Sequence, residues 1–175
     1  MRKFALAAAA TLLATSAWAQ STTEKTGVNS MLGVAPSTED FVKEAATSDM
    51  FEIESSKLAL EHSDEATKAF AQQMIQDHEK TTADLKGLVT SGKVQATLPT
   101  AMTDAQAKML NDLKSMKSDE FTKKYHSEQV DAHEDAVDLF KRYGDEGEQA
   151  DLKIWAAKTL PTLQHHLEMA KELNK

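Results

Sequence analysis

His78 occupies a position where an apolar side chain is expected. Residues 65–90 have the hydrophobic period of an amphipathic helix, and at about 100° per residue the apolar face carries Phe70, Met74 and Leu85. His78 projects into the middle of that face. Because an unpartnered polar group in an apolar seam costs roughly several kcal/mol, this imidazole must find a hydrogen-bond acceptor or a metal ion.

Three further polar side chains repeat this pattern elsewhere in the chain. His133 lies on the apolar face of its predicted helix, Glu52 lies between inward-facing alanines, and His166 lies on the shoulder of an apolar face. Each of four predicted helices therefore directs one potential metal ligand toward the same interior: Glu52, His78, His133 and His166.

Three imidazoles and one carboxylate form a donor set for one transition-metal ion. These ligands suit zinc, iron, copper, manganese or nickel, and spacing does not choose between them. The chain has no cysteine, which excludes thiolate and iron–sulfur ligation. Asp77, Gln129 and Glu134 stand close enough in sequence to orient the ligands through hydrogen bonds. The alternative is a metal-free network of buried hydrogen bonds that fixes the register of the helices.

Four long helices are needed to position these residues. Prolines and glycines are sparse after Thr38, whereas Ala, Leu, Lys, Glu and Met are abundant. Short links favour two antiparallel hairpins, and the link between the hairpins is long. We therefore predict an all-α four-helix bundle over residues 38–175, with one long connection carrying an extra short helix. The expected helices are about 39–62, 65–90, 104–116, 119–143 and 148–173.

The height of His166 along the bundle fits least well. Counting from a predicted helix end at Gly144, His133 lies about eleven residues back, whereas His166 lies about twenty or more residues forward. Pro161 is also expected to disturb the helix between them.

The N-terminus has the pattern of a secretory signal peptide. A short basic start and an apolar run over residues 4–13 precede Ala17 and Ala19, which predicts cleavage after Ala19. Residues 1–19 are thus expected to be removed, and residues 20–37 read as a flexible polar lead. No later segment is apolar enough to cross a bilayer, so we expect a periplasmic or secreted protein with no transmembrane segment in the mature chain.

The mature chain is strongly acidic. Loss of Arg2 and Lys3 leaves 18 basic residues against 28 acidic ones and changes the formal charge from -8 to -10. Such a surface repels nucleic acid, so no nucleic-acid partner is expected.

Four strings of the sequence resemble one known family. They are "FVKEAATSDMFEIESSKLALEHS", "FAQQMIQDHEKTTADLK", "FTKKYHSEQVDAHEDAVDLF" and "WAAKTLPTLQHHLEMA". Together they span about residues 41–173 and are similar to the bacterial domain-of-unknown-function family 4142, a set of exported proteins. The resemblance implies a ferritin-like helical bundle, export and metal binding, but no established reaction. It places the functional residues on Glu52, His78, His133 and His166.

The chain departs from true ferritins in its ligand pattern. Their di-iron sites use Glu-x-x-His pairs on two helices. Here Ile75, Val130 and Leu163 stand three residues before His78, His133 and His166. A carboxylate-rich di-iron oxidase or iron store is therefore not expected.

Three hypotheses about function follow. The first is an exported bundle that binds one transition-metal ion in its core and serves in stress response, redox chemistry or metal handling. The second is a metal-free structural module with a protein partner in the cell envelope. The third, a metal-dependent oxidoreductase, would need an open coordination position. No nucleophile or acid–base pair accompanies the four residues, so an enzyme is the less favoured interpretation.

Overall fold

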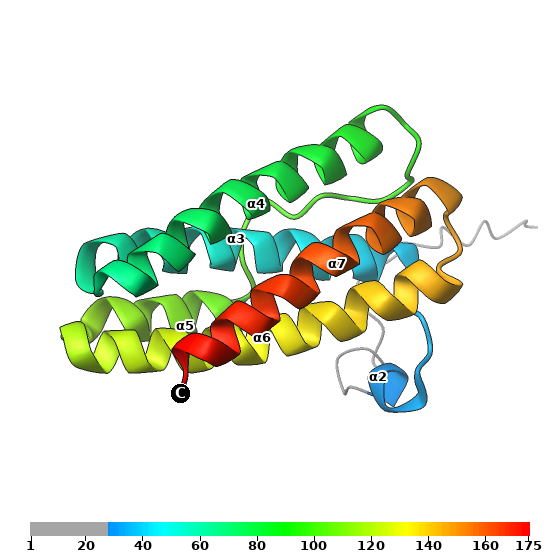
Figure 1. Cartoon of the computed structure of the whole chain (residues 1–175). Helices are drawn as coiled ribbons and strands as arrows, with labels where there is room; N and C mark the ends of the chain where they lie inside the picture. The colour runs from blue at the N-terminus through cyan, green and yellow to red at the C-terminus, as the bar shows by residue number, and fades with distance from the viewer. Residues whose placement is uncertain (1–27) are drawn as a thin grey trace, which may run out of the picture.

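The structure is a computed structural model that describes residues 28–175, and within this range it contains helices and no strand (Figure 1). Four long helices form the bundle, which confirms the predicted all-α fold with an extra short helix in one long connection. The helices are α2 (Val28–Leu32), α3 (Thr38–His62), α4 (Glu65–Thr90), α5 (Asp104–Ser115), α6 (Ser118–Glu146) and α7 (Ala150–Leu173). The predicted signal peptide, residues 1–19, lies outside the described residues.

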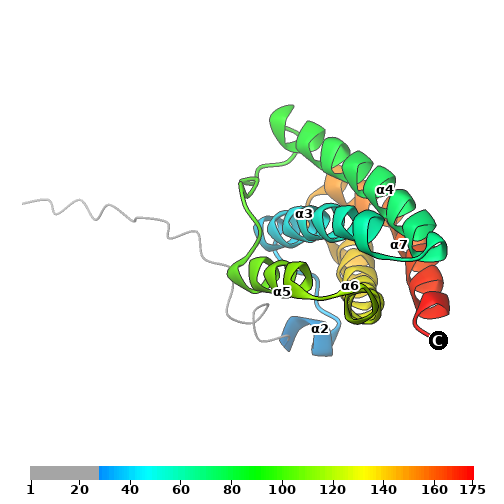
Figure 2. The same ribbon diagram turned by 90° about the vertical axis from the view of Figure 1, so that its left-hand side faces the viewer.

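The bundle consists of two antiparallel hairpins, α3 with α4 and α6 with α7 (Figures 1 and 2). The hairpins meet where α3 packs on α6 and where α4 packs on α7. Helix α5 lies beside α3 and α6. A site built from residues of α4, α6 and α7 therefore joins one hairpin to the other.

Side-chain caps begin three of the helices where the sequence calls for them. Ser37 accepts from the backbone N–H of Asp40 at the start of α3, and Asp64 accepts from that of Thr67 at the start of α4. Thr103 forms a capping box with Gln106 at the start of α5. Each cap satisfies an N–H group that has no acceptor inside its helix.

The prediction that the third long helix ends at Gly144 is wrong. Helix α6 continues to Glu146, and Gly147 follows it with its N–H bonded to the carbonyl of Tyr143 at 2.8 Å. A Cβ on Gly144 would lie 3.3 Å from the backbone of Ala157 in α7. Gly144 therefore serves a close approach of two helices rather than a helix end.

Helix α2 lies within residues 20–37, whose polar composition predicts a flexible lead and no helix. Ser30 donates to Asp138 of α6 at 2.7 Å, and Arg142 of α6 donates to the carbonyl of Val34 at 2.7 Å. Arg142 also donates to Asp138, at 2.8 Å. These contacts attach the segment around α2 to α6 through a hydroxyl and a backbone carbonyl group. Contacts of this kind leave no periodic pattern of apolar residues in the sequence.

The core consists of two apolar clusters separated by a polar layer. One cluster gathers Phe41, Tyr143 and Trp155, and the other gathers Phe70 and Tyr125. Along every long helix, the predicted inward polar residue lies between positions that belong to the two clusters. The polar residues thus form one layer across the bundle, at the height where the clusters meet. They are Glu52, His78, His133 and His166, and each is at most 3% exposed.

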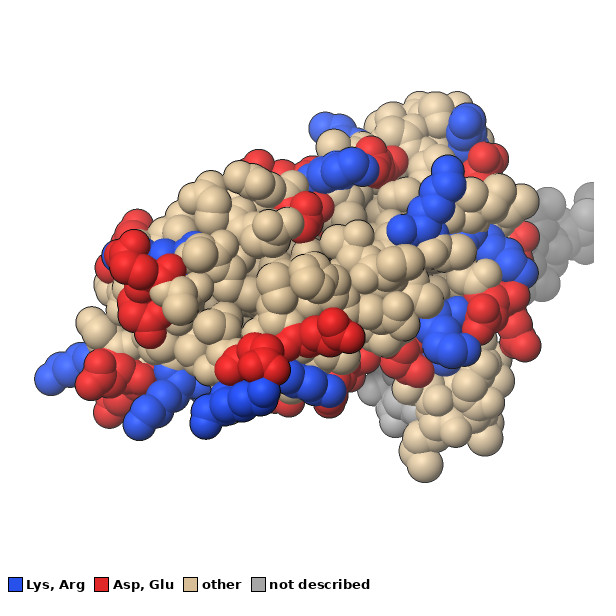
Figure 3. Space-filling model, in the orientation of Figure 1, with Lys and Arg blue, Asp and Glu red and all other residues tan. Residues whose placement is uncertain are grey.

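One face of the molecule carries charges of both signs. On the face shown in Figure 3, Lys and Arg side chains are interspersed with Asp and Glu. Over residues 28–175, every helix is too short or too polar to cross a lipid bilayer.

Candidate metal centre

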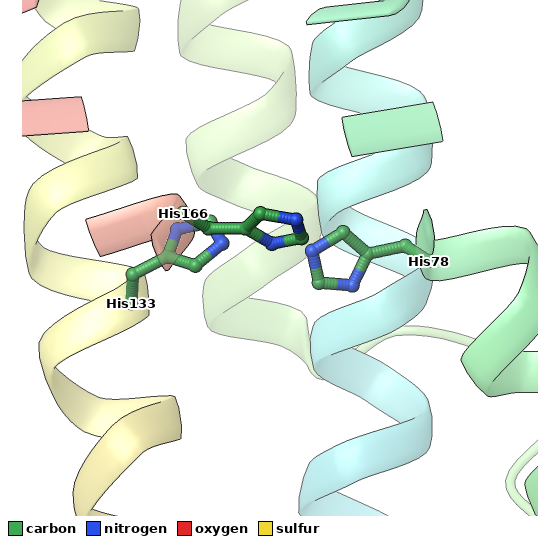
Figure 4. A group of neighbouring side chains, drawn as sticks. All are labelled: His78, His133 and His166. Atoms are coloured by element: carbon green, nitrogen blue, oxygen red, sulfur yellow. The ribbon is translucent and has the colours of Figure 1, made fainter. Parts of the chain in front are cut away.

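Three histidines from three helices converge in the polar layer. One ring nitrogen each from His78 of α4, His133 of α6 and His166 of α7 lie within 4.8 Å of one another. Figure 4 shows the three rings facing a common point between the helices. The ring centroids are 5.3–5.7 Å apart, and the side chains are 1–3% exposed.

His78 is held by a carboxylate on the neighbouring helix. Its Nδ1 lies 2.8 Å from Oδ1 of Asp49, which is 6% exposed. A carboxylate accepts, so Nδ1 carries the proton of this bond, and in the neutral ring Nε2 has a free lone pair. The other oxygen of Asp49 accepts from the hydroxyls of Thr81 at 2.8 Å and Thr82 at 3.1 Å. Asp49 is thereby fixed, and it fixes the ring in turn.

The other two rings are held in the same manner. Nε2 of His166 lies 2.9 Å from Oδ2 of Asp77, and Nδ1 of His133 lies 2.9 Å from the backbone oxygen of Gln129. In each ring the bonded nitrogen donates, which leaves the second nitrogen as the acceptor. Metal-ligating histidines in proteins are oriented by this kind of hydrogen bond to a carboxylate or a carbonyl.

The second nitrogen of every ring is buried without a protein partner. Nε2 of His78, Nε2 of His133 and Nδ1 of His166 have no hydrogen bond to any described residue. Such an atom costs about 1–3 kcal/mol, and three of them at one place are rare in a stable core. A single cation between the rings would satisfy all three together.

Glu52 lies in the same layer, but its carboxylate oxygens do not belong to the cluster formed by the three ring nitrogens. Its Oε2 accepts from Nε2 of Gln129 at 2.7 Å, while Oε1 is buried with no partner in the described chain. Burial raises the pKa of Glu52 to about 7, and the charge of His78 and the bond from Gln129 offset only part of that effect.

The environment keeps two of the imidazoles neutral. Burial, together with the neighbouring charge of His78, lowers the pKa of His133 to about 3. Burial lowers the pKa of His166 to about 4, although Asp77 acts in the opposite direction. For His78, burial lowers the pKa, but the bond and charge of Asp49 outweigh it and the net direction is upward. A neutral imidazole is the form that ligates a metal.

The remaining polar residues predicted to orient ligands divide into two groups. Asp77 and Gln129 hydrogen-bond histidines of the cluster, although Asp77 bonds His166 and not its sequence neighbour His78. Glu134 lies at the surface in an ion pair with Lys171 at 2.7 Å, so its predicted role was wrong. Adjacent helix positions point in different directions, which is why Glu134 turns away from His133.

Asp49, the hydrogen-bond partner of His78, is the residue of this layer that the sequence did not predict. It lies four residues after Ala45 and three before Glu52, so it shares the inward face of α3. This spacing places Asp49 on the buried face of its helix, and a buried Asp is a suitable hydrogen-bond partner for a histidine.

The expected difference in height between His133 and His166 is much smaller in the structure. The turn between α6 and α7 lies at Gly147–Gln149 rather than at Gly144. His133 is then about fourteen residues before it and His166 about seventeen after, a difference of roughly 4.5 Å. Helix α7 also continues through Pro161, which is exposed.

Residues 23–173 match one protein family, described as a domain of unknown function (DUF4142). The chain belongs to the DUF4142 family. This confirms the resemblance that the four sequence strings indicate. A search of curated proteins gives no match to this DUF4142 protein.

A solved structure described as "CopM in the Cu(II)-bound form" has a similar fold. It is 14% identical to this DUF4142 protein, with a TM-score of 0.67, and the match covers 81% of this chain and 97% of the other. At this level of identity the likeness concerns the fold.

Proposed function

We propose that this DUF4142 protein binds one transition-metal ion between its two helical hairpins. His78, His133 and His166 provide the ligand nitrogens, and the buried, unpartnered Oε1 of Glu52 on α3 is the proposed fourth ligand, which must move toward the three rings when the ion binds. Asp49, Asp77 and the carbonyl of Gln129 orient the three rings. The single observation that carries the proposal is the convergence of three buried ring nitrogens, each without a partner among residues 28–175.

The donor set fits an ion of this class. Imidazole nitrogen with carboxylate oxygen suits zinc, copper, iron, nickel and manganese. Each ring already has the outer hydrogen bond that a metal-bound histidine needs. The similar fold of a protein whose structure contains Cu(II) is compatible with a metal in a bundle of this shape.

The role that we propose is metal handling, meaning capture and holding of an ion, under stress or in redox balance. We propose no turnover, because no nucleophile lies beside the cluster among residues 28–175 and the carboxylates of Asp49 and Asp77 are engaged in orienting its rings. The signal-peptide pattern of residues 1–19 supports a periplasmic or secreted location. A protein partner in the envelope belongs to the rival hypothesis.

That rival is a metal-free structural module. The bonds from His78 to Asp49 and from His166 to Asp77 would then fix the register of the helices. Such a network explains the bonded nitrogens. It leaves the three converging nitrogens unexplained, which is why we favour the metal.

The test begins with the processed protein, purified from the exporting cell without chelator or affinity-tag metal. Intact-mass spectrometry checks cleavage after Ala19, and elemental mass spectrometry counts the metals. We expect about one equivalent of one transition metal. His166→Ala should abolish it, whereas His165→Ala should retain it, because His165 is exposed on the same helix.

Protein with less than about a tenth of an equivalent, even after incubation with zinc, copper, iron, nickel or manganese, would refute the proposal. Equal metal content in His166→Ala and His165→Ala would also refute it. A structural network instead predicts that His78→Ala lowers the melting temperature equally with and without metal.

A further inference from the structure

Three carboxyl groups surround the histidine cluster without a basic side chain to balance them. Asp49 bonds His78 and two threonines, Asp77 bonds His166 and Gln73, and Glu52 bonds Gln129. Among residues 28–175, none of the three forms an ion pair with Lys or Arg. Positive charge in this layer must therefore come from a histidine or from the bound ion.

We propose that the site selects a divalent transition-metal ion over monovalent copper, and that Asp49 and Asp77 determine this selectivity. The inference rests on the proposed function. The attraction between a bound ion and fixed carboxylates is proportional to the charge of the ion, so a dication gains twice what a monocation gains from the same groups. Burial at the cluster reduces screening by solvent and salt.

Ligand softness points in the same direction. Monovalent copper prefers thiolate and thioether sulfur, whereas imidazole and carboxylate suit divalent ions. The chain has no cysteine. Met74 is one helical turn before His78, but it is fully buried and packs in the apolar cluster with Phe70 and Tyr125. The groups that converge on the site offer nitrogen and oxygen.

Asp49 and Asp77 act through the histidines, so we describe them as positioning residues. Asn has the shape of Asp and an oxygen that accepts from the same ring nitrogen, but it carries no charge. Asp→Asn substitution therefore separates the charge of the carboxylate from its geometry. Since the dehydration cost of an ion is the same for wild type and variant, comparing each ion with itself removes that contribution.

The experiment measures affinities for Zn(II) and, under anaerobic reducing conditions, for Cu(I), by competition with coloured chelators. The proteins are wild type, Asp49→Asn, Asp77→Asn and Met74→Leu. For wild type we expect Zn(II) to bind with one equivalent. Each Asp→Asn variant should bind Zn(II) about 10–100-fold more weakly than wild type. The fold loss in Cu(I) affinity should be less than a third as large as the fold loss in Zn(II) affinity. Met74→Leu should change neither.

Two outcomes would overturn the selectivity while leaving the site in place. One is an equal loss of Zn(II) and Cu(I) affinity in both Asp variants. The other is Cu(I) binding that disappears in Met74→Leu. If wild type binds neither of these two ions nor Cu(II), iron, nickel or manganese, the proposed function itself fails. Circular dichroism checks that each variant is folded, and Asp77, at 28% side-chain exposure, remains informative if Asp49→Asn does not fold.

Discussion

Replacing His133 by leucine should make the metal-free protein more stable and the metal-loaded protein less stable than wild type. His133 is 1% exposed, and its Nε2 has no partner among the described residues. Leucine has a similar volume, fits the apolar surroundings and brings no polar atom. The substitution therefore removes a proposed metal ligand and, at the same time, the destabilising effect of a buried nitrogen without a hydrogen-bond partner.

The magnitude follows from the contacts of the ring. Removal of the unpartnered Nε2 gains about 1–3 kcal/mol, and loss of the 2.9 Å bond from Nδ1 to the carbonyl of Gln129 costs about 0.5–1.5 kcal/mol. Burial of leucine in place of the ring adds roughly 1 kcal/mol. The variant should gain about 2 kcal/mol in unfolding free energy, which raises the melting temperature by about 4–8 °C.

Added metal should reverse this order. At a free zinc concentration about 1,000 times its Kd, wild type gains about 4.1 kcal/mol by mass action, and a variant without the site gains nothing. The assay is thermal unfolding of both proteins, followed by circular dichroism, in chelator and in excess zinc. A leucine variant that is several kcal/mol less stable in chelator, with wild type unaffected by zinc, would refute the metal site in favour of a hydrogen-bond network.

Two further predictions concern residues outside the cluster. A Cβ on Gly147 would lie 2.5 Å from the ring and carbonyl oxygen of Tyr143, so Gly147→Ala should lower the unfolding free energy by about 1–3 kcal/mol. Gly87 has open space around it, so Gly87→Ala should raise the unfolding free energy by up to about 1 kcal/mol. Urea unfolding measures the free energy of both variants, and equal effects of the two substitutions would contradict the predicted clash at Gly147. Glu128 is 2% exposed, and burial raises its pKa above the ordinary 4.5 even though Lys124 Nζ is 3.3 Å away. Above its folded pKa the native state holds a buried charge, so Glu128→Gln should stabilise by about 1 kcal/mol at pH 8. This advantage should shrink as the pH falls through the folded pKa and should vanish well below 4.5, where the carboxyl is protonated in both the folded and the unfolded wild type; a gain independent of pH would show that charge is not the cause.

Hydrophobic periodicity predicted the four long helices and the inward direction of Glu52, His78, His133 and His166, because these helices bury a wide apolar face. What it could not predict was the use of single residues at helix contacts. A glycine near the end of a periodic segment reads as a stop, but Gly144 permits α6 to approach Ala157. The apparent displacement of His166 resulted from that one boundary.

Partners of the histidines were harder to predict than the histidines themselves. Asp77 bonds a ring on α7, and Asp49 of α3 bonds a ring on α4. Both are contacts between helices, and they depend on rotation and height together, which a single-helix projection does not supply. Glu134 has a different explanation: it was chosen as the sequence neighbour of His133, and adjacent helix positions face different directions, so it lies at the surface.

The origin of the three histidines along the chain has a consequence for assembly. One comes from the hairpin completed near residue 90, and the other two come from the hairpin completed near residue 173. Neither hairpin alone contains the cluster, and its last member, His166, lies in the second half of α7. A chain that stops short of α7, or one cut in the connection between α4 and α5 so that its halves separate, can form helices but not this centre. The histidine layer therefore reports whether both hairpins have been made and brought together.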